Sequence, residues 1–350
     1  MSPTTVAERI PQETLRWLTA PENPAVAVLT RRTLLGEKSS PDLEELWMRR
    51  NEYPPVSAIL NSMHVDGSWL PPERDYKKYQ GSLWQIHFLG ELWACPEDER
   101  VQRAAAYAFS RQLDDGSWSC NGRPAASIPC LTANIGRALA RLGFAKDPRV
   151  RAALAYITDL HRDLGYFGCR GMRDYALNGY CHMLTPKVLL FLAEIPQSCW
   201  PSGAAALRDA CIQALRDKEI FRSLPAEYAE FKETVLPLPK AKVAEARNRF
   251  IAEHEPLHYK EKKGWLRFGY PLSYNSDALE ALLALAGAGE VRRPEYVPAI
   301  QAVKQAADAQ MRWALMNTFN GKMLADVEIK GKPSKWVTLR ALQALETFAS

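Results

Sequence analysis

The chain has 350 residues, of which 47% are hydrophobic and 24% are charged, and its formal net charge is +5. This apolar content supplies a large core and argues against a disordered chain. Charges of both signs are mixed along the sequence, without basic clusters interleaved with aromatic residues, so we expect no nucleic-acid partner. No apolar run approaches the ~20 residues that cross a bilayer, so we expect no integral membrane segment.

No secretory leader is predicted at the start of the chain. The first residues carry charged side chains, including Glu8, Arg9 and Glu13, and contain no apolar h-region. We therefore expect a cytoplasmic protein, a setting in which disulfides are rare. The seven cysteines are then expected to be buried thiols or metal ligands.

The N-terminal part is predicted to contain a pair of helices. Residues 11–35 have a helical pattern that Pro21 and Pro24 interrupt. Proline is tolerated in the first turn of a helix but not in its interior. We therefore expect two short helices, separated at these prolines.

A sequence repeat with a period of 49 residues follows. Residues 66–69 read Asp-Gly-Ser-Trp, and the same four residues return at 115–118, 49 positions later. A third position, 164–167, reads Leu-Gly-Tyr-Phe and keeps the glycine and an aromatic residue. Asp98 and Asp147 occupy equivalent positions ahead of alanine-rich stretches and are predicted helix N-caps. Repeats of this length are typical of stacked helical hairpins.

Each turn is followed by a more apolar helical stretch. Residues 131–142 have apolar side chains with a 3.6-residue period, and residues 183–195 are apolar on almost all sides. Each repeat is therefore predicted to hold an amphipathic outer helix, a glycine–aromatic turn and a buried inner helix. Stacked hairpins of this kind form a solenoid or a closed ring, so we expect an all-α protein with an α/α-toroid fold around a central cavity.

The C-terminal half continues the pattern after one irregular region. Residues 200–265 are polar and interrupted by prolines, and we interpret them as an insertion or a lid over one end of the ring. Residues 277–288 and 336–348 are predicted inner helices, and residues 298–315 are a predicted outer helix. No β-hairpin signal is present, so residues 1–350 are expected to form a single toroid domain.

Residues 112–118 read Gln-Leu-Asp-Asp-Gly-Ser-Trp and resemble the QW motif of squalene–hopene and oxidosqualene cyclases. In that motif the glutamine ties the end of an outer helix to the next repeat; residues 66–69 resemble it with Met63 at the glutamine position. Protein prenyltransferase β-subunits and lanthionine cyclases share the toroid plan. The resemblance implies a terpene cyclase/prenyltransferase-like enzyme acting on a hydrophobic substrate, for example an isoprenoid, in the central cavity.

The chain departs from these cyclases in its acidic residues. Class II terpene cyclases protonate an alkene with an Asp-x-Asp-Asp motif, which is absent here, as is the aspartate-rich motif of diphosphate-ionising synthases. Asp277, at the start of an apolar inner helix, is the candidate for an isolated catalytic acid. A helix N-cap is the alternative role for this residue.

Four of the cysteines follow the repeat. Cys120 and Cys169 lie 49 residues apart, each two residues after the aromatic residue of its turn. Each is followed by a second cysteine, Cys130 or Cys181, at the start of an inner helix. Because neighbouring repeats touch, the four sulfur atoms are expected to converge. Four thiolates suit Zn²⁺ or, as the alternative, an iron–sulfur cluster.

His182 directly follows Cys181 and is a further candidate ligand and catalytic residue. In lanthionine cyclases, which are similar in overall plan, a Cys-His pair and a second cysteine bind zinc at one end of the toroid. The resemblance implies a catalytic zinc held by Cys181, His182 and either Cys130 or Cys169, with one position open for substrate. A site closed by all four cysteines would be structural, and unligated buried thiols with a hydrogen-bonded histidine are the remaining alternative.

Aromatic residues near the inner helices are expected to line the central cavity. Aromatic walls suit an apolar or cationic ligand, although packing between helices is the alternative role for such rings. A lysine near the last inner helix would place a positive charge at the cavity mouth. The candidate substrate-binding residues are Tyr79, Trp84, Trp265, Tyr270, Tyr274, Lys335 and Trp336.

These observations leave three functions open. The first is a zinc-dependent enzyme that acts on a hydrophobic small molecule in the cavity. The second is a non-catalytic four-cysteine metal-binding repeat protein that binds a partner or a lipid. The third is a metal-free terpene cyclase. An open zinc position would distinguish the first from the second, and an acidic residue deep in an aromatic cavity would support the third.

Overall fold

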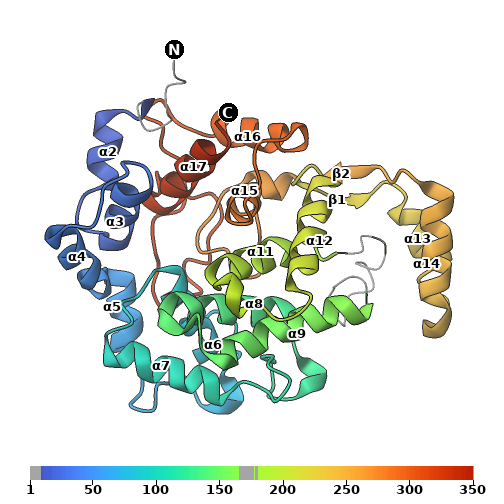
Figure 1. Ribbon diagram of the computed structural model, residues 1–350, viewed down its shortest axis with the longest axis horizontal. Coiled ribbons are helices and arrows are strands. Elements are labelled where there is room, and N and C mark those ends of the chain that lie inside the picture. The colour runs from blue at the N-terminus through green and yellow to red at the C-terminus, as the bar shows by residue number, and fades with distance from the viewer. Residues whose placement is uncertain (1–8, 165–176, 178–179, 350) are drawn as a thin grey trace.

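The computed structural model describes residues 9–164, 177 and 180–349 and is mainly helical (Figure 1). Its described part contains 15 α-helices, several short 3-10 turns and one two-strand hairpin. The predicted predominance of helix is therefore confirmed. No helix in these ranges is both long and apolar enough to span a bilayer.

The α-helices are, in chain order, α2 (Gln12–Leu18), α3 (Pro24–Thr33), α4 (Pro41–Met48), α5 (Pro54–Asn61), α6 (Ser82–Glu91), α7 (Glu99–Ser110), α8 (Pro129–Leu139), α9 (Pro148–Leu164), α11 (Leu184–Glu194), α12 (Ala204–Arg216), α13 (Tyr228–Thr234), α14 (Lys240–His254), α15 (Ala278–Gly287), α16 (Val297–Gln305) and α17 (Lys335–Thr347). Strands β1 (Arg222–Pro225) and β2 (Tyr259–Glu261) pair antiparallel.

Five helices form the buried centre of the molecule: α6, α8, α11, α15 and α17. Every residue of α6 and α8 is buried, as are most residues of the other three. Each of these helices contacts the next in this order, and α17 also contacts α3. The contacts continue through the 3-10 turn Arg49–Glu52, which touches both α3 and α5, and from α5 to α6.

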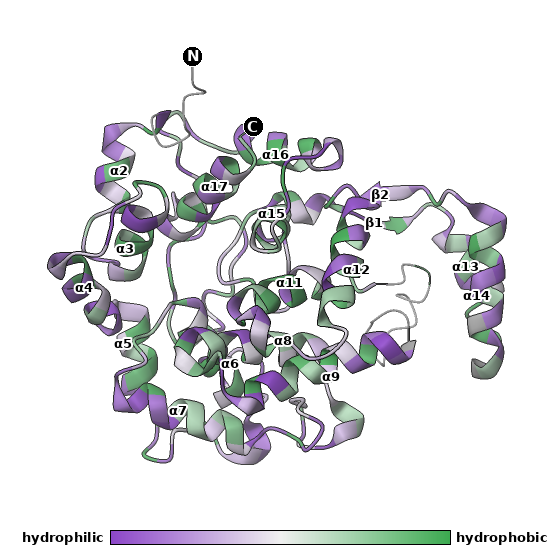
Figure 2. Cartoon of the chain, in the orientation of Figure 1, coloured by the Kyte–Doolittle hydropathy of each residue, from purple (hydrophilic) through white to green (hydrophobic). Residues whose placement is uncertain are grey.

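Amphipathic helices cover this centre. α7 packs on α6, α9 on α8, α12 on α11, and α16 on both α15 and α17. In α7, for example, Val101, Ala104 and Ala108 are buried whereas Arg103 is exposed. In Figure 2 the central helices are mostly hydrophobic and the peripheral ones also carry hydrophilic residues. The predicted alternation of outer and inner helices is therefore present.

The repeated turns have the same backbone structure. Gly67 and Gly116 have φ angles of +88° and +84°, a conformation that favours glycine. A Cβ atom at either position would lie 2.4 Å from a backbone carbonyl oxygen of the following outer helix. Asp66 and Asp115 each accept a hydrogen bond from the backbone N–H two residues later, at 3.0 Å. The Asp-Gly-Ser-Trp sequence therefore encodes a tight turn against the next helix.

The tryptophan of each turn is anchored by its indole N–H. In three turns the indole Nε1 donates to a backbone carbonyl oxygen ten residues earlier in the chain. The pairs are Trp69–Ile59 (2.7 Å), Trp118–Ala108 (2.9 Å) and Trp313–Val303 (2.7 Å). The third turn was not predicted, because Met311, with φ of 56°, stands where the first two turns have glycine.

The side chain of Gln112 connects one repeat to the next. Its Nε2 donates to the carbonyl oxygen of Gly116 in its own turn and to that of Arg149 in α9, both at 2.8 Å. The predicted caps also form: the carboxylates of Asp98 and Asp147 accept the backbone N–H two residues later, both at 2.8 Å. These contacts tie α7 and its turn to α9.

The predicted outer helix at residues 298–315 was too long. α16 ends at Gln305, and the chain then forms the third turn. The carboxylate of Asp308 accepts the backbone N–H groups of Gln310 (2.9 Å) and Arg312 (2.8 Å), which satisfies them outside a helix. The apolar pattern was misleading because Trp313 and Leu315 are buried as helical residues would be, although they lie outside the helix.

The irregular region at 200–265 consists of two parts. α12 packs on α9 and α11 in the main body. The rest contains the unpredicted β1–β2 hairpin together with α13 and α14, which project to one side of the main body in Figure 1. This projection has a separate hydrophobic cluster around Phe231 and Phe250. Its role as a lid stays a prediction, and the third turn copy at 164–167 extends outside the described residues.

Candidate functional site

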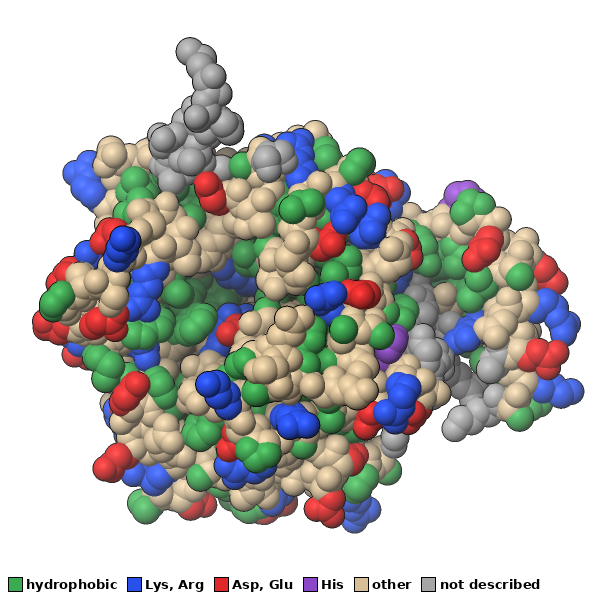
Figure 3. All heavy atoms as spheres, viewed as in Figure 1, with side chains coloured by type: hydrophobic (Ala, Val, Ile, Leu, Met, Phe, Trp, Pro, Cys, Tyr) green, Lys and Arg blue, Asp and Glu red, His purple; other side chains and the backbone are tan. Residues whose placement is uncertain are grey.

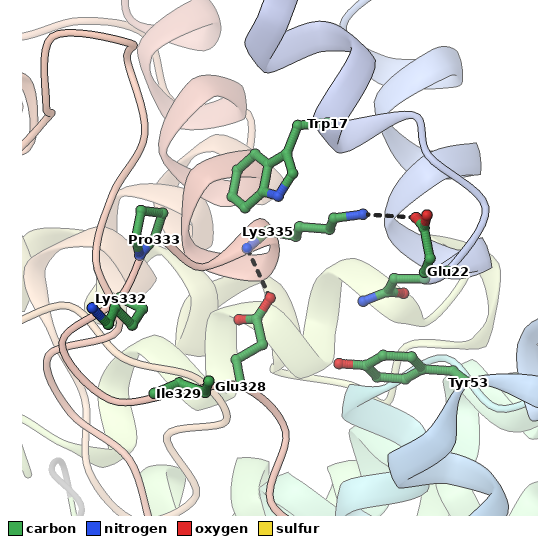
Figure 4. Close-up of a pocket in the computed structure, with 9 residues that line it drawn as sticks. Trp17, Glu22, Tyr53, Glu328, Ile329, Lys332, Pro333 and Lys335 are labelled. Atoms are coloured by element: carbon green, nitrogen blue, oxygen red, sulfur yellow. Dashed lines mark hydrogen bonds and ion pairs between the residues drawn. The ribbon is translucent and has the colours of Figure 1, made fainter.

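A pocket of about 270 Å³ opens between the N-terminal helices and the approach to α17. In Figure 3 the molecule is hollowed between these helices and the centre, with basic side chains visible inside the hollow. The pocket is lined by Trp17, Glu22, Asn23, Tyr53, Glu328, Ile329, Lys332, Pro333 and Lys335, most of which are labelled in Figure 4. Apolar walls with a few polar groups are typical of small-molecule sites.

Three helices begin at this pocket. Asn23 caps α3 by accepting the N–H of Val26 at 3.2 Å, and Tyr53 precedes the first residue of α5. Ser334 caps α17 by accepting the N–H of Val337 at 2.9 Å. Helix N-termini carry partial positive charge, so the pocket favours anionic groups.

The half-buried carboxylate of Glu328 lies in the pocket at the start of α17. It accepts hydrogen bonds from the Ser334 hydroxyl and from the backbone N–H of Lys335, the latter at 2.7 Å. Burial raises the pKa of Glu328 to about 7, although these hydrogen bonds and the Lys335 charge act in the opposite direction. At neutral pH the carboxyl group is therefore present in both protonation states.

The side chain of Lys335 extends between Trp17 and Glu22, and its backbone nitrogen is hydrogen-bonded to Glu328 (Figure 4). The Lys335 Nζ lies 3.3 Å from a carboxylate oxygen of Glu22 and 5.9 Å from the centroid of the Trp17 ring. The hydroxyl of Tyr53 donates to the carbonyl oxygen of Val327 at 2.9 Å. Lys335 was predicted from the sequence but Glu328 was not, since a single glutamate in a loop has no distinguishing pattern.

The predicted aromatic residues form three separate groups. Tyr79, Trp84 and Tyr274 come together: the Trp84 ring lies 4.9 Å from each of the other two in edge contacts. Phe319, which was not predicted, stacks on Tyr79 at 4.3 Å. Because Tyr79 and Tyr274 remain partly exposed whereas Trp84 is buried, the first two rings are the ones a ligand can reach.

The second group is the stack of Tyr270 on Trp336, with ring centroids 4.7 Å apart. The third is the stack of His182 on Trp265, with centroids 3.8 Å apart. All four side chains are buried. Burial holds the pKa of His182 well below its usual value, so the imidazole is neutral at physiological pH.

Asp277 acts as the N-cap of α15. Its two carboxylate oxygens accept the backbone N–H groups of Glu280 (2.7 Å) and Gly269 (2.9 Å), and the residue has no exposed surface. Burial raises the pKa of Asp277 to about 6. The capping role that the sequence analysis offered as the alternative to catalysis is therefore present.

The cysteines are described only in part. Cys130 lies at the start of α8 and Cys181 lies just before α11, a helix that contacts α8; both side chains are buried. Cys120 is half-buried, and Cys169 lies outside the described residues. In the part of the chain that is described, no three His, Cys, Asp or Glu side chains are grouped so that they could hold a metal ion. The zinc site, with iron–sulfur as its alternative, stays a prediction.

Charged side chains inside the central helices form a network that the sequence analysis did not select. Within it the shortest ion pairs are Arg137–Glu91 (2.5 Å), Arg141–Glu194 (2.6 Å) and Lys187–Glu280 (3.0 Å). These residues connect α6, α8, α11 and α15. Charged residues within otherwise apolar helices could have predicted these ion pairs, because charged side chains are normally buried only when they are paired.

No protein-family model matches the sequence, and no curated protein matches it either. The function must therefore be argued from the site itself.

Proposed function

We propose that the protein is an enzyme with an α/α-ring fold, in which Glu328 exchanges a proton with a hydrophobic small molecule bound in the pocket. The observation that carries this proposal is the carboxyl group of Glu328, which has a pKa of about 7 and lines an open pocket. Carboxyl groups with raised pKa values in pockets are typical of general acid–base catalysts.

The order of helix contacts supports the ring. The five buried helices contact one another in sequence, and the contacts return from α17 through α3 and α5 to α6. The three tryptophan turns, with equivalent indole hydrogen bonds, are distributed along this circuit. A solenoid that did not close would leave its first and last helices without this contact.

The pKa of Glu328 indicates the class of chemistry. A group that titrates near neutral pH can donate a proton to a leaving oxygen or nitrogen, or remove one from an activated carbon. It is too weak an acid to protonate an isolated alkene, which is the initiating step of class II terpene cyclases. We therefore favour proton transfer in an isomerisation, elimination or hydrolysis over protonation-initiated cyclisation.

The lining of the pocket indicates the substrate class. Trp17, Tyr53 and Ile329 provide apolar surface, whereas Lys335 and the N-termini of three helices favour a polar or anionic group. A substrate with an apolar body and one polar group next to the reacting carbon fits both features. The size of the pocket matches a small molecule or the end of a longer one.

Two measurements on the full-length protein test this proposal. With carbon-13 in the side-chain carboxyl groups of glutamate, one resonance is expected to titrate near pH 7 and to be missing from Glu328→Gln. A midpoint near 4.5 for that resonance would contradict the proposal. Glutamine has a similar shape: its carbonyl oxygen can accept the N–H of Lys335 and its amide group can donate to the hydroxyl oxygen of Ser334, so this variant is expected to fold.

The second measurement looks for turnover. Small-molecule and lipid extracts are incubated with wild type and with Glu328→Gln, and the products are compared by mass spectrometry. Wild type is expected to consume at least one compound that Glu328→Gln leaves intact. Glu245→Gln, at an exposed ion pair with Arg249 on α14, is the matched control and should behave as wild type. Equal consumption by all three proteins, or by none, would argue against catalysis by Glu328.

Zinc-dependent chemistry remains a second proposal, supported by the placement of Cys130 and Cys181 at the starts of two contacting helices. Helix N-termini favour the thiolate form that binds zinc. Elemental analysis of protein prepared without a histidine tag should show stoichiometric zinc that is lost in Cys130→Ser and Cys181→Ser. Iron with acid-labile sulfide would indicate a cluster instead, and protein without metal would remove the proposal.

A further inference from the structure

One buried cation of the central helices differs from its neighbours. Arg137, Arg141 and Lys187 each form an ion pair with a carboxylate. Arg340 of α17 is buried to a similar degree, with 9% of its surface exposed, but forms no ion pair or hydrogen bond with the side chains that the structure describes. Its guanidinium carbon lies 5.2 Å from the centroid of the Tyr270 ring.

The nearby acids do not neutralise Arg340 by direct contact. Asp277 and Glu91 interact with its charge only through space. Both oxygens of Asp277 accept backbone N–H groups, and Glu91 is paired with Arg137. The guanidinium of Arg340 therefore lies near two carboxylates whose oxygen atoms already have other partners.

A second donor lies on the same face of α17. Trp336, one turn before Arg340, stacks on the ring of Tyr270, and its indole N–H interacts with the hydroxyl of Tyr53. Residues four positions apart in a helix lie on one face, so the indole and the guanidinium are neighbours along α17. Of these two donors beside the Tyr270 ring, Arg340 is the one without a direct side-chain partner among the described residues.

Burying a guanidinium without a partner is unfavourable, and proteins normally supply an anion or keep the group in water. The nitrogen atoms of Arg340 are not among the buried side-chain atoms that solvent cannot reach. Water therefore has access to the guanidinium. A planar guanidinium can bind an oxyanion through two parallel hydrogen bonds, and the Tyr270 ring beside it limits its motion.

We propose that Arg340 is the centre of an anion-binding site that holds a carboxylate or phosphate group between α17 and the segment containing Tyr270. The anion is either free or part of a larger molecule, and both present the same oxyanion to Arg340. This site does not use the carboxyl group of Glu328, although Tyr53, which contacts Trp336, also lines the Glu328 pocket.

The test measures thermal unfolding and calorimetric binding with inorganic phosphate and with acetate, at ionic strength held constant with sodium chloride. Wild type is expected to bind one of the two anions and to gain about 1–2 °C in Tm at a concentration of roughly ten times Kd. Arg340→Met, which keeps the length of the stem and removes the charge, is expected to lose this response. Lys335→Met removes a cation of the Glu328 pocket and is expected to keep it.

The unliganded variants provide a second readout. If the buried charge of Arg340 is unpaired in the absence of an anion, its removal should not destabilise the protein. Arg340→Met without added anion should then unfold at the same temperature as wild type or higher. Arg340→Lys keeps the charge and should retain weaker binding. Binding that persists in Arg340→Met, or wild type that responds to neither anion, would overturn the proposal. If small anions bind only weakly and an extracted organic phosphate or carboxylate binds tightly through Arg340, the anion is part of a larger ligand.

Discussion

The Nε2 atom of His87 on α6 lies 3.1 Å from the hydroxyl oxygen of Ser273, 186 residues later in the chain. Asn134 of α8 also binds this position, donating to the carbonyl oxygen of Ser273 at 3.0 Å. These contacts hold the segment before α15 against two central helices. They explain why Tyr274, the next residue, meets the ring of Trp84.

The first prediction concerns acid stability. Burial lowers the pKa of His87 to about 4, whereas an unfolded histidine has a pKa near 6.5. Between these values the unfolded chain binds a proton that the folded chain does not, so stability is present above pH 6.5 and is lost as pH falls towards 4. Between pH 7 and pH 4, the unfolding free energy of wild type should therefore fall by about 3 kcal/mol more than that of His87→Gln.

Urea unfolding at both pH values measures this difference. The same acid-dependent loss in wild type and His87→Gln would show that His87 is not the group responsible.

The buried pair of Arg137 and Glu91 provides the second prediction. Arg137→Met leaves the Glu91 carboxylate buried, with its nearest remaining cation, Arg141, at 3.9 Å. We expect this variant to lose about 3–5 kcal/mol of unfolding free energy. Adding Glu91→Leu removes the unpaired charge and should restore a large part of the loss.

Chemical denaturation of both single variants and the double variant gives the coupling energy of the pair. Arg49→Met, at an exposed ion pair, should cost less than about 1 kcal/mol. A double variant as unstable as the sum of its single variants would contradict this account of the network.

The third prediction concerns the repeated turns. Trp118→Phe removes the indole N–H and leaves the carbonyl oxygen of Ala108 with the backbone N–H of Arg111 as its remaining donor. We expect a loss of about 2–4 kcal/mol from the lost indole hydrogen bond and the smaller ring. Trp69→Phe should show a similar loss, because its indole has the equivalent contact. Half-buried Trp47 is the control, and an equal loss in Trp47→Phe would argue against a special role for the turns.

The fourth prediction tests the close packing of α6 on α8. A Cβ atom at Gly90 would lie 2.4 Å from the Cα atom of Ala138, which is backbone and cannot rotate away. Gly90→Ala should therefore destabilise the protein by about 1–3 kcal/mol, although alanine favours helix by about 1 kcal/mol. Gly264→Ala, with no atom within 4 Å of the added Cβ, should be close to neutral in the same urea titration. A stabilised Gly90→Ala would show that the two helices separate easily.

Local features of the fold could be predicted from the sequence. The helix starts at Asp98 and Asp147, and the Asp-Gly-Ser-Trp turns at 66–69 and 115–118, depend on contacts within a few residues. The turn at Trp313 could not be predicted, since Met311 adopts the glycine conformation only because the surrounding packing holds it there.

The candidate site was predicted only in part. Tyr79, Trp84 and Tyr274 do form one aromatic group, but Tyr270 and Trp265 belong to two others. Lys335 was selected without its partner Glu22, which is 313 residues away in the chain. Contacts over such separations have no signature in one sequence, because they depend on how the helices pack.

The sequence by itself determined the helical class, the alternation of outer and inner helices and the repeated turns, because these follow from hydrophobic periodicity and local hydrogen bonding. Only the tertiary structure decided which charged groups are buried and which of them have partners. Glu328 acquires its raised pKa, and Arg340 its unpaired position, from neighbours on other elements. The physical reason is that desolvation and charge pairing depend on distances in space, which local sequence preferences do not specify.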